Sequence, residues 1–433
     1  MTRTIFENAT LFDGIEAPKP NSYVVVEGDR IAAVGHGRVS SADGDQRFDL
    51  RGKTIMPGMV QCHFHTGFGP DAGNPMPILG LNMPPAYLGM IAMRNAQIAL
   101  DNGVTSIIGS SNGDHLDLAL RDAIKLGVTR GPRVIACTTE MGPSGDYSDG
   151  NNRSWFMRLG NTGLIRSLNG VEEFRRAVRE EVGRGCEIVK ISLGKGHGAS
   201  PSDERCSLTK AEVEVVVETA HAMGALVRAH CPSRAGVILC AKAGIDIIDH
   251  ADRIDDEGIE AVLKADATVV PSLLWSHRFL TLADNWDYAT GDFPIGDGFP
   301  ESPQETQTRL RCVREDYEYT CSMLPRMQAA GVRLVLGDDY GFPMMPHGDY
   351  VSEMEVTAAT GISHLDLMRW ATRNGAAAMK HKGTELGTLE PGKLADLIVV
   401  DGDPTENVSI LRDLSNLRFV MQDGEMRKNT CEE

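Results

Sequence analysis

Two histidines separated by one residue, His63 and His65, end an apolar, strand-like run of the chain. Because side chains alternate across a strand, both imidazoles point to the same face. Imidazole nitrogens bind Zn²⁺ and similar cations, so this pair could hold one metal ion. The alternative is a pair held in a polar network, since the chain has 12 histidines.

Ionisable residues end four other apolar runs: Lys190, His230, His250 and the adjacent pair Asp338 and Asp339. Neutral imidazole and carboxylate are ordinary metal ligands, whereas a lysine ammonium is not. Beside a dication, however, the pKa of a lysine should fall, and the neutral amine can take up CO₂ to form a carbamate that bridges two ions. The alternative for Lys190 is a buried salt bridge.

These residues belong to a middle region in which strand and helix signals alternate. Eight strand-like runs occur, at residues 58–65, 104–110, 133–140, 187–193, 226–231, 245–251, 267–273 and 333–339. Helical patterns that close on a glycine lie between them, as at 170–185 and 209–224. Eight such units predict a (β/α)8 TIM barrel, an α/β fold whose active sites lie at the carboxyl ends of the strands. A doubly wound open sheet is the rival fold, which the absence of an early Gly-x-Gly-x-x-Gly motif disfavours.

The two ends of the chain have a different pattern. Residues 1–57 and 385–433 alternate apolar and polar residues with Gly or Asp at the turns, which predicts short strands. We expect both ends to form one small β-sandwich domain, with the barrel at residues 58–384. Two long segments rich in Gly, Pro or aromatic residues, 67–85 and 283–304, predict either binding loops or oligomer contacts.

Composition narrows the class of protein. The 433 residues are 42% hydrophobic and 24% charged, as is ordinary for a globular chain. A net charge of −17 without a Lys/Arg cluster disfavours binding to nucleic acid or an anionic membrane. No apolar run approaches the roughly 18 residues of a membrane span. Nine cysteines without CxxC spacing, and no secretory signal pattern at the start, favour reduced thiols and a cytoplasmic location.

The motifs in combination resemble the amidohydrolase superfamily. The match rests on PGMVQCHFH, VKISLGKG, VRAHCPSRAG, IDHAD, LGDDYGFP and LGTLEPGKLADLIVVDGDP, and it runs from about residue 5 to 428. Within the superfamily, the sequence is similar to the imidazolonepropionase-like branch, which includes prolidase-type and ochratoxin-type amidases.

The resemblance implies a site for two divalent metal ions, with zinc the expected ion. His63 and His65 would bind the more buried ion, and His230 and His250 would bind the second. Lys190, carboxylated by CO₂, would bridge the two ions.

The resemblance also implies roles for the residues after the eighth run. Asp339 would be both a metal ligand and the catalytic proton shuttle, while Asp338 occupies the threonine position of the family pattern. Strand parity agrees, because it turns Asp339 inward and Asp338 toward the helices. His197, Tyr340 and His347 are the candidate substrate-binding residues.

Three positions depart from the family pattern. Gln61 stands where the family usually has an aspartate. Residues 231–232 lack the second histidine that often follows the position of His230. The loop at 143–146 lacks the histidine of the family's Gly-His-Gly-Asp stretch. These changes fall outside the metal ligand set and concern its surroundings and the substrate.

Arg228 shares its strand face with His230 and should point into the barrel below the metal ions. An unpaired buried guanidinium is very costly, so we expect Arg228 to be paired in a structural role. Cys62 has the opposite parity from His63 and should belong to the core.

We expect a hydrolase that cleaves an amide C–N bond of a small molecule, such as an N-acyl amino acid or a dipeptide-like amide. The metal ions would polarise the carbonyl and lower the pKa of a water, and Asp339 would move its proton to the leaving nitrogen. A cyclic amide, arylurea or ester hydrolase is the alternative on the same site, and a catalytically inactive assembly protein is the alternative of another class. We expect a homo-oligomer with no nucleic-acid or membrane partner.

Overall fold

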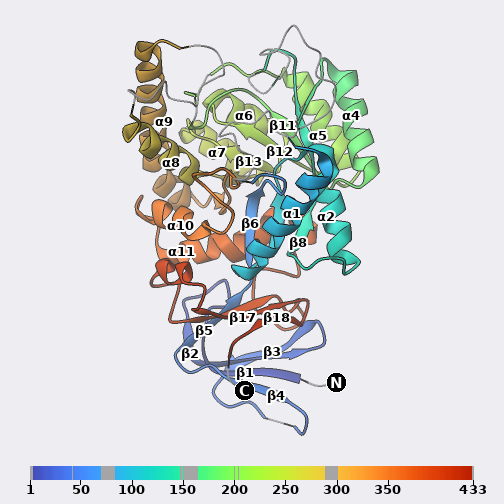
Figure 1. Ribbon diagram of the computed structural model, residues 1–433, viewed down its shortest axis with the longest axis vertical. Helices are drawn as coiled ribbons and strands as arrows, with labels where there is room; N and C mark the ends of the chain where they lie inside the picture. The colour runs from blue at the N-terminus through green and yellow to red at the C-terminus, as the bar shows by residue number, and fades with distance from the viewer. Residues whose placement is uncertain are drawn as a thin grey trace.

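The computed structural model describes residues 3–40, 42–69, 83–146, 149, 164–198, 200–202, 204–287 and 301–431. Parallel strands with helices around them form the upper part of the molecule, and a sheet built of strands from both ends of the chain forms the lower part (Figure 1). The predicted α/β class is confirmed at this level. Most of the two predicted loops, residues 70–82 and 288–300, lies outside the described residues.

The parallel strands form two sheets. One contains β6 (Met59–Phe64), β7 (Val104–Gly109) and β8 (Arg133–Ile135). The other has the order β10 (Ile165–Ser167), β9 (Cys137–Gly142), β11 (Ile188–Ser192), β12 (Leu226–Cys231), β13 (Ile247–His250), β14 (Thr268–Val270) and β15 (Arg333–Leu334). A backbone hydrogen bond of 2.9 Å from Cys62 N to Leu336 O links β6 to the segment that follows β15. Each of the eight predicted runs therefore contains at least one of these strands.

Three predicted runs differ in detail from the structure. The run 133–140 divides at Ala136 into β8, which pairs with β7, and β9, which pairs with β11. The run 267–273 ends early because Ser272, at φ 53°, turns the chain into the next helix. The run 333–339 leaves the ladder after Leu334, and the Glu353 carboxylate accepts a hydrogen bond from Gly337 N at 2.7 Å in place of a strand partner.

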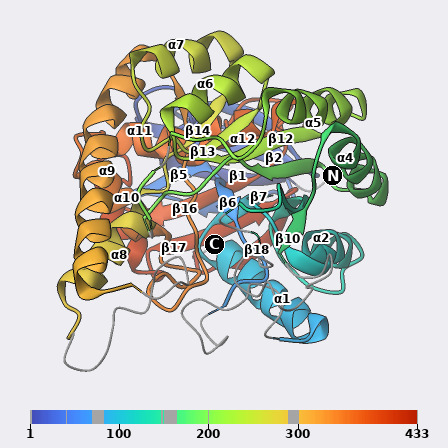
Figure 2. The ribbon, with the colours of Figure 1, turned by 90° about the horizontal axis from the view of Figure 1, so that it is seen from above.

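Helices surround the parallel strands when the molecule is seen from above (Figure 2). They are α1 (Pro85–Asp101), α2 (Leu116–Lys125), α4 (Val171–Arg184), α5 (Lys210–Ala222), α6 (Arg234–Ala243), α7 (Asp256–Ala265), α8 (Leu273–Asp284), α9 (Pro303–Ala330), α10 (Tyr350–Ala358), α11 (His364–Arg369) and α12 (Gly375–Ala378). Local signals set their ends: Thr209 and Glu212 form a capping box at the start of α5, and Gly185 ends α4 at φ 111°. Within the described ranges, no helix is long and apolar enough to cross a membrane.

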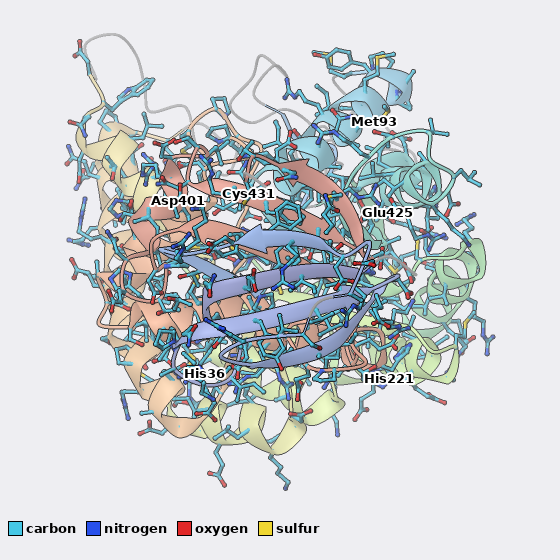
Figure 3. All side chains as sticks on the ribbon, turned by 90° about the horizontal axis from the view of Figure 1, so that it is seen from below. His36, Met93, His221, Asp401, Glu425 and Cys431 are labelled. Atoms are coloured by element: carbon cyan, nitrogen blue, oxygen red, sulfur yellow. The ribbon has the colours of Figure 1, made fainter. Side chains whose placement is uncertain are left out.

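Strands from both ends of the chain form one eight-stranded sheet. Its members are β1 (Arg3–Leu11), β2 (Lys19–Glu27), β3 (Arg30–His36), β4 (Gln46–Asp49), β5 (Lys53–Pro57), β16 (Leu397–Asp401), β17 (Leu417–Gln422) and β18 (Glu425–Asn429). The ends join where β5 pairs antiparallel with β16, and Figure 3 shows the two sets of strands side by side from below. The rings of Phe6, Phe48 and Phe419 pack together in its core at centroid distances of 5.0–5.4 Å. The joint sheet is confirmed, while its packing as a sandwich stays a prediction.

Candidate metal centre

Candidate ligand atoms of two buried histidines and one partly exposed aspartate converge where β6 ends. His63 Nε2 lies 3.2 Å from His65 Nε2 and 2.8 Å from Asp339 Oδ1, and His65 Nε2 lies 3.1 Å from the same oxygen. Ligand atoms that bind zinc tetrahedrally at about 2.0–2.1 Å lie about 3.3 Å from one another. The spacing of these three atoms therefore fits a single shared ion.

The hydrogen bond behind His65 defines which of its nitrogens is free to bind a metal. His65 Nδ1 lies 2.9 Å from the carbonyl oxygen of Ser111, which can only accept, so Nδ1 carries the hydrogen. In the neutral ring, Nε2 is then a bare acceptor that faces the Asp339 carboxylate. Two acceptors at 3.1 Å repel each other unless a cation lies between them, so this contact favours a bound ion.

Both ring nitrogens of His63 have protein neighbours. Its Nδ1 lies 3.2 Å from Arg228 Nη2 behind the ring, and its Nε2, which faces Asp339, also lies 2.7 Å from Ser110 Oγ. Burial lowers the pKa of His63, against the opposite effect of the nearby Asp339 and Asp249 carboxylates. The neutral form, which is the form that binds metals, is therefore favoured.

A second group of rings lies next to His63, whose ring centroid is 5.5 Å from that of His250. His250 packs edge-on against His230 at a centroid distance of 4.6 Å and stacks on His197 at 3.7 Å. Burial is the main cause that lowers the pKa of His230 to about 3 and the pKa of His250 well below its usual value, so both rings are neutral, which is the form that can bind a metal. His250 Nδ1 is buried and has no hydrogen-bond partner among the described residues. The structure thus places three imidazoles next to one another at this end of the site.

The stacking of His197 on His250 limits what the pair can bind. Ligand atoms of His197, His250 and Asp339 lie within 4.8 Å of one another, which is close enough for a metal site. The two rings are nearly parallel, however, at 16°, so their lone pairs lie in separate parallel planes and do not meet at one ion. We therefore place His197 beside the metal ligands and not among them.

His197 is positioned by Asp252, whose Oδ1 lies 3.1 Å from its Nδ1. Burial lowers the pKa of His197, but the Asp252 carboxylate outweighs that effect and raises the pKa to about 9. His197 Nε2 is buried without a hydrogen-bond partner in the described part of the chain. This nitrogen is available to a ligand.

Lys190 forms the buried salt bridge that the sequence left open as the alternative to a carbamate. Its Nζ lies 2.6 Å from Asp249 Oδ2 and 3.3 Å from Ser110 Oγ. Sequence reasoning missed Asp249, although its place directly before His250 in the apolar run 245–251 was a usable signal.

Arg228 holds the other side of Asp249. Its Nη2 donates to Asp249 Oδ1 at 2.5 Å, and its Nη1 donates to the carbonyl oxygens of Cys62 and Gly109 at 3.0 and 2.7 Å. The side chain is completely buried. The predicted structural pairing of Arg228 is confirmed, and Cys62 is buried in the core as expected.

The side chains of the adjacent residues Asp338 and Asp339 point in different directions, as the alternation of side chains along a strand predicts. Asp338 is completely buried, and its Oδ2 accepts hydrogen bonds from Leu274 N and Trp275 N at 2.8 and 3.3 Å, in the first turn of α8. Asp339 instead faces the imidazoles, and its side chain remains 19% exposed. Asp338 stabilises a helix, whereas Asp339 belongs to the site.

Tyr340 and His347 lie behind the ligand cluster. The Tyr340 hydroxyl donates to Glu353 Oε2 at 3.0 Å, and His347 Nε2 donates to His65 O at 3.1 Å. Both side chains are buried, and each polar group is engaged by the protein. Their contacts support the loop that carries Asp339 and the backbone of His65.

Glu140 is a further carboxylate at the site that sequence reasoning missed. It lies on β9 in register with Lys190, so the two side chains share one face of neighbouring strands. Burial raises the pKa of Glu140 against the opposing effect of the Lys190 charge. Its place at the end of the apolar run 133–140 was the signal that could have identified it.

A cluster of histidines and an aspartate at the carboxyl ends of parallel strands is the arrangement of a metal-dependent enzyme. The sequence profile described as "Amidohydrolase family" matches residues 54–428. The chain therefore belongs to the amidohydrolase family, and it is a hydrolase that acts on C–N bonds.

Individual relatives agree with this assignment. The chain is 25% identical to ochratoxinase of Aspergillus niger over 453 aligned residues, covering 98% of this chain and 86% of the relative. The solved structure of A. niger ochratoxinase matches with a TM-score of 0.82 at 23% identity, over 99% of this chain and 96% of the other. A Xaa-Pro dipeptidase with methionine bound in its active site matches with a TM-score of 0.82 at 24% identity, over 99% and 100% of the two chains. The predicted resemblance is confirmed.

Proposed function

We propose that this chain is a binuclear metal-dependent amidase that cleaves a small amide whose leaving part is an amino acid. The observation that carries the proposal is the convergence of His63, His65 and Asp339 ligand atoms within 3.2 Å of one another. The substrate class is supported by the names of the relatives, since both ochratoxinase and a Xaa-Pro dipeptidase are among them.

We also propose that the parallel strands close into one (β/α)8 barrel. The hydrogen bond from Cys62 N to Leu336 O supports closure between the eighth and first strand positions. We propose boundaries of 58–384 for the barrel and 1–57 plus 385–433 for a β-sandwich domain; the change of sheet between β5 and β6, and the return of β16 (Leu397–Asp401) to the sheet of β5, support them. A homo-oligomer stays a prediction.

The donor set fits two divalent ions, for which zinc is our choice. His63, His65 and Asp339 would hold the first, and His230 and His250 would hold the second on the far side of Asp339. When bound, such ions polarise the substrate carbonyl and activate a water. Lys190 would bridge them as a carbamate, for which its ammonium must leave Asp249; Arg228 remains to neutralise that carboxylate.

Asp339 is the proposed proton carrier. Its carboxylate lies among the ligand atoms yet remains partly exposed, so it can reach a substrate that enters the site. There it would accept a proton at a carboxylate oxygen and release it to the leaving nitrogen.

His197 is the proposed contact for the substrate carboxylate. Asp252 fixes its ring, and its buried Nε2 has no partner among the described residues. We propose that Tyr340 and His347 act on the substrate only indirectly, by holding the backbone around the ligands.

A comparison of matched substrates tests the proposal. An N-acyl amino acid should be cleaved by metal-replete protein, and its methyl ester or decarboxylated analogue should lose about 2 kcal/mol of transition-state stabilisation. His197→Asn should reduce this discrimination, whereas His36→Asn, at an exposed site on β3, should leave it unchanged. Equal kcat/KM for the acid and its neutral analogue would instead favour arylurea, lactam or ester hydrolysis.

A further inference from the structure

Glu140 is a buried acid whose charge the protein only partly balances. The residue is 6% exposed. Its Oε2 accepts a hydrogen bond of 3.3 Å from Ser111 Oγ, while Oε1 has no donor among the described residues. An unmatched carboxylate oxygen in a low-dielectric interior is costly unless a donor or a cation arrives.

The nearby lysine does not supply that partner. Lys190 shares a strand face with Glu140, but its Nζ is engaged by Asp249 at 2.6 Å and by Ser110 at 3.3 Å. If Lys190 becomes a carbamate, as proposed above, it turns anionic and increases the need for positive charge beside Glu140. Among the residues that the structure describes, none therefore donates to Oε1.

The position of Glu140 indicates where such a partner would lie. Ser111, which donates to Glu140, also accepts from His65 Nδ1 through its carbonyl oxygen at 2.9 Å. Glu140 thus lies in the wall next to His65 and Lys190, close to where the scissile carbonyl would bind. A cationic nitrogen a short distance from that carbonyl would be within its reach.

We propose that Glu140 is a specificity-determining residue that binds a cationic nitrogen on the acyl side of the scissile bond. This inference rests on the proposed amidase function. Glu140 would select substrates with an ammonium group beside the carbonyl over neutral acyl compounds of the same shape.

The test uses two substrates of nearly equal shape. Glycyl-leucine and propionyl-leucine share the leaving amino acid and differ by an ammonium group in place of a methyl group. Metal-replete protein should cleave glycyl-leucine with a kcat/KM about tenfold or more above that of propionyl-leucine, as expected for one charged hydrogen bond. Glu140→Gln should reduce this ratio to near unity, while Glu214→Gln, at an exposed position of α5, should preserve it.

A second variant separates substrate binding from support of the metal site. Ser111→Ala removes the hydroxyl that donates to Glu140 but keeps the carbonyl that holds His65. If Glu140 acted only by positioning Ser111, Glu140→Gln and Ser111→Ala would each change kcat/KM by the same factor for the two substrates. The thermal unfolding midpoint of each variant shows whether it folds, and the substrate ratio is independent of the fraction of active protein.

Each outcome of this test either supports or overturns the proposed role of Glu140. A ratio that falls in Glu140→Gln and persists in Ser111→Ala supports the proposal. Cleavage of both substrates without preference, or a ratio unchanged by Glu140→Gln, overturns it while the amidase function stands. Cleavage of neither substrate, nor of any other N-acyl amino acid, overturns the amidase function and this inference with it.

Discussion

Two layers of polar groups at the carboxyl ends of the strands differ in how their charges are matched. In the lower layer, Asp249 lies between Arg228 and Lys190, and Arg228 also donates to two backbone carbonyls. In the upper layer, the imidazole nitrogens of His63 and His65 face the Asp339 carboxylate at 2.8 and 3.1 Å. The lower layer pairs its charges within the protein, whereas the upper layer is the one for which we propose bound cations.

The contrast shows how buried charge can be assigned to structure or to function. A buried ion pair neutralises its own charges, and removal of one partner lowers the free energy of unfolding. A group of converging acceptors is stable only when a ligand supplies positive charge. Variants in the two layers should therefore fail in different measurements.

The largest effect is expected in the lower layer. Arg228→Met should lower the free energy of unfolding by about 3–5 kcal/mol, because it leaves the Asp249 carboxylate buried beside fewer donors. Urea unfolding of metal-free protein measures this change. Arg311→Met, at a side chain that is 69% exposed, is the control and should change stability by less than about 0.5 kcal/mol. A loss below about 1 kcal/mol for Arg228→Met would show that the ion pair with Asp249 contributes little to the stability of the fold.

The adjacent aspartates give the sharpest test of the upper layer. Asp339→Asn should reduce turnover at least about 10²-fold, since it removes the proton carrier. Asp338→Asn should retain most of the turnover and lose about 1 kcal/mol of stability, because its carboxylate accepts from the first turn of α8. Near-normal turnover in Asp339→Asn together with inactive Asp338→Asn would show that Asp338, and not Asp339, is the proton carrier.

A small effect is expected from a partly exposed pair at the opposite face, His221 and Asp246 (Figure 3 labels His221). The hydrogen bond that His221 donates to Asp246 raises the pKa of His221 above 6.5, against partial burial. Because the folded-state pKa is the higher one, the stabilisation is present below pH 6.5 and is lost as the pH rises through the raised pKa. His221→Gln should remove a pH-dependent contribution below about 1 kcal/mol. An NMR titration that gives His221 a pKa at or below its ordinary value would contradict this.

Much of the site could be predicted from sequence because it depends on local rules. Strand parity and the positions of apolar runs place His63, His65 and Asp339 on converging strand ends, and the same rules separate Asp338 from Asp339. The sheet shared by both chain ends follows equally from alternating patterns at residues 3–57 and 397–429.

The remaining features depend on contacts between distant segments. The break at Ala136 is fixed by Glu187, whose carboxylate accepts from Ala136 N at 3.0 Å. Glu353, on α10, holds Gly337 and Tyr340 and so shapes the loop that carries Asp339. Sequence patterns report the face of an element but not which distant group meets it, so these partners were not foreseen.

The central claim is that the upper layer binds metal, and elemental analysis of protein reconstituted with divalent zinc tests it most directly. The account predicts about two tightly bound ions per chain. It also predicts a clear loss of bound metal in Lys190→Ala, with partial recovery of activity on addition of short-chain carboxylates. Arg311→Met, whose side chain is 69% exposed, serves as the control and should bind as the wild type does. Fewer than about one ion per chain in fully reconstituted, active protein would contradict the account.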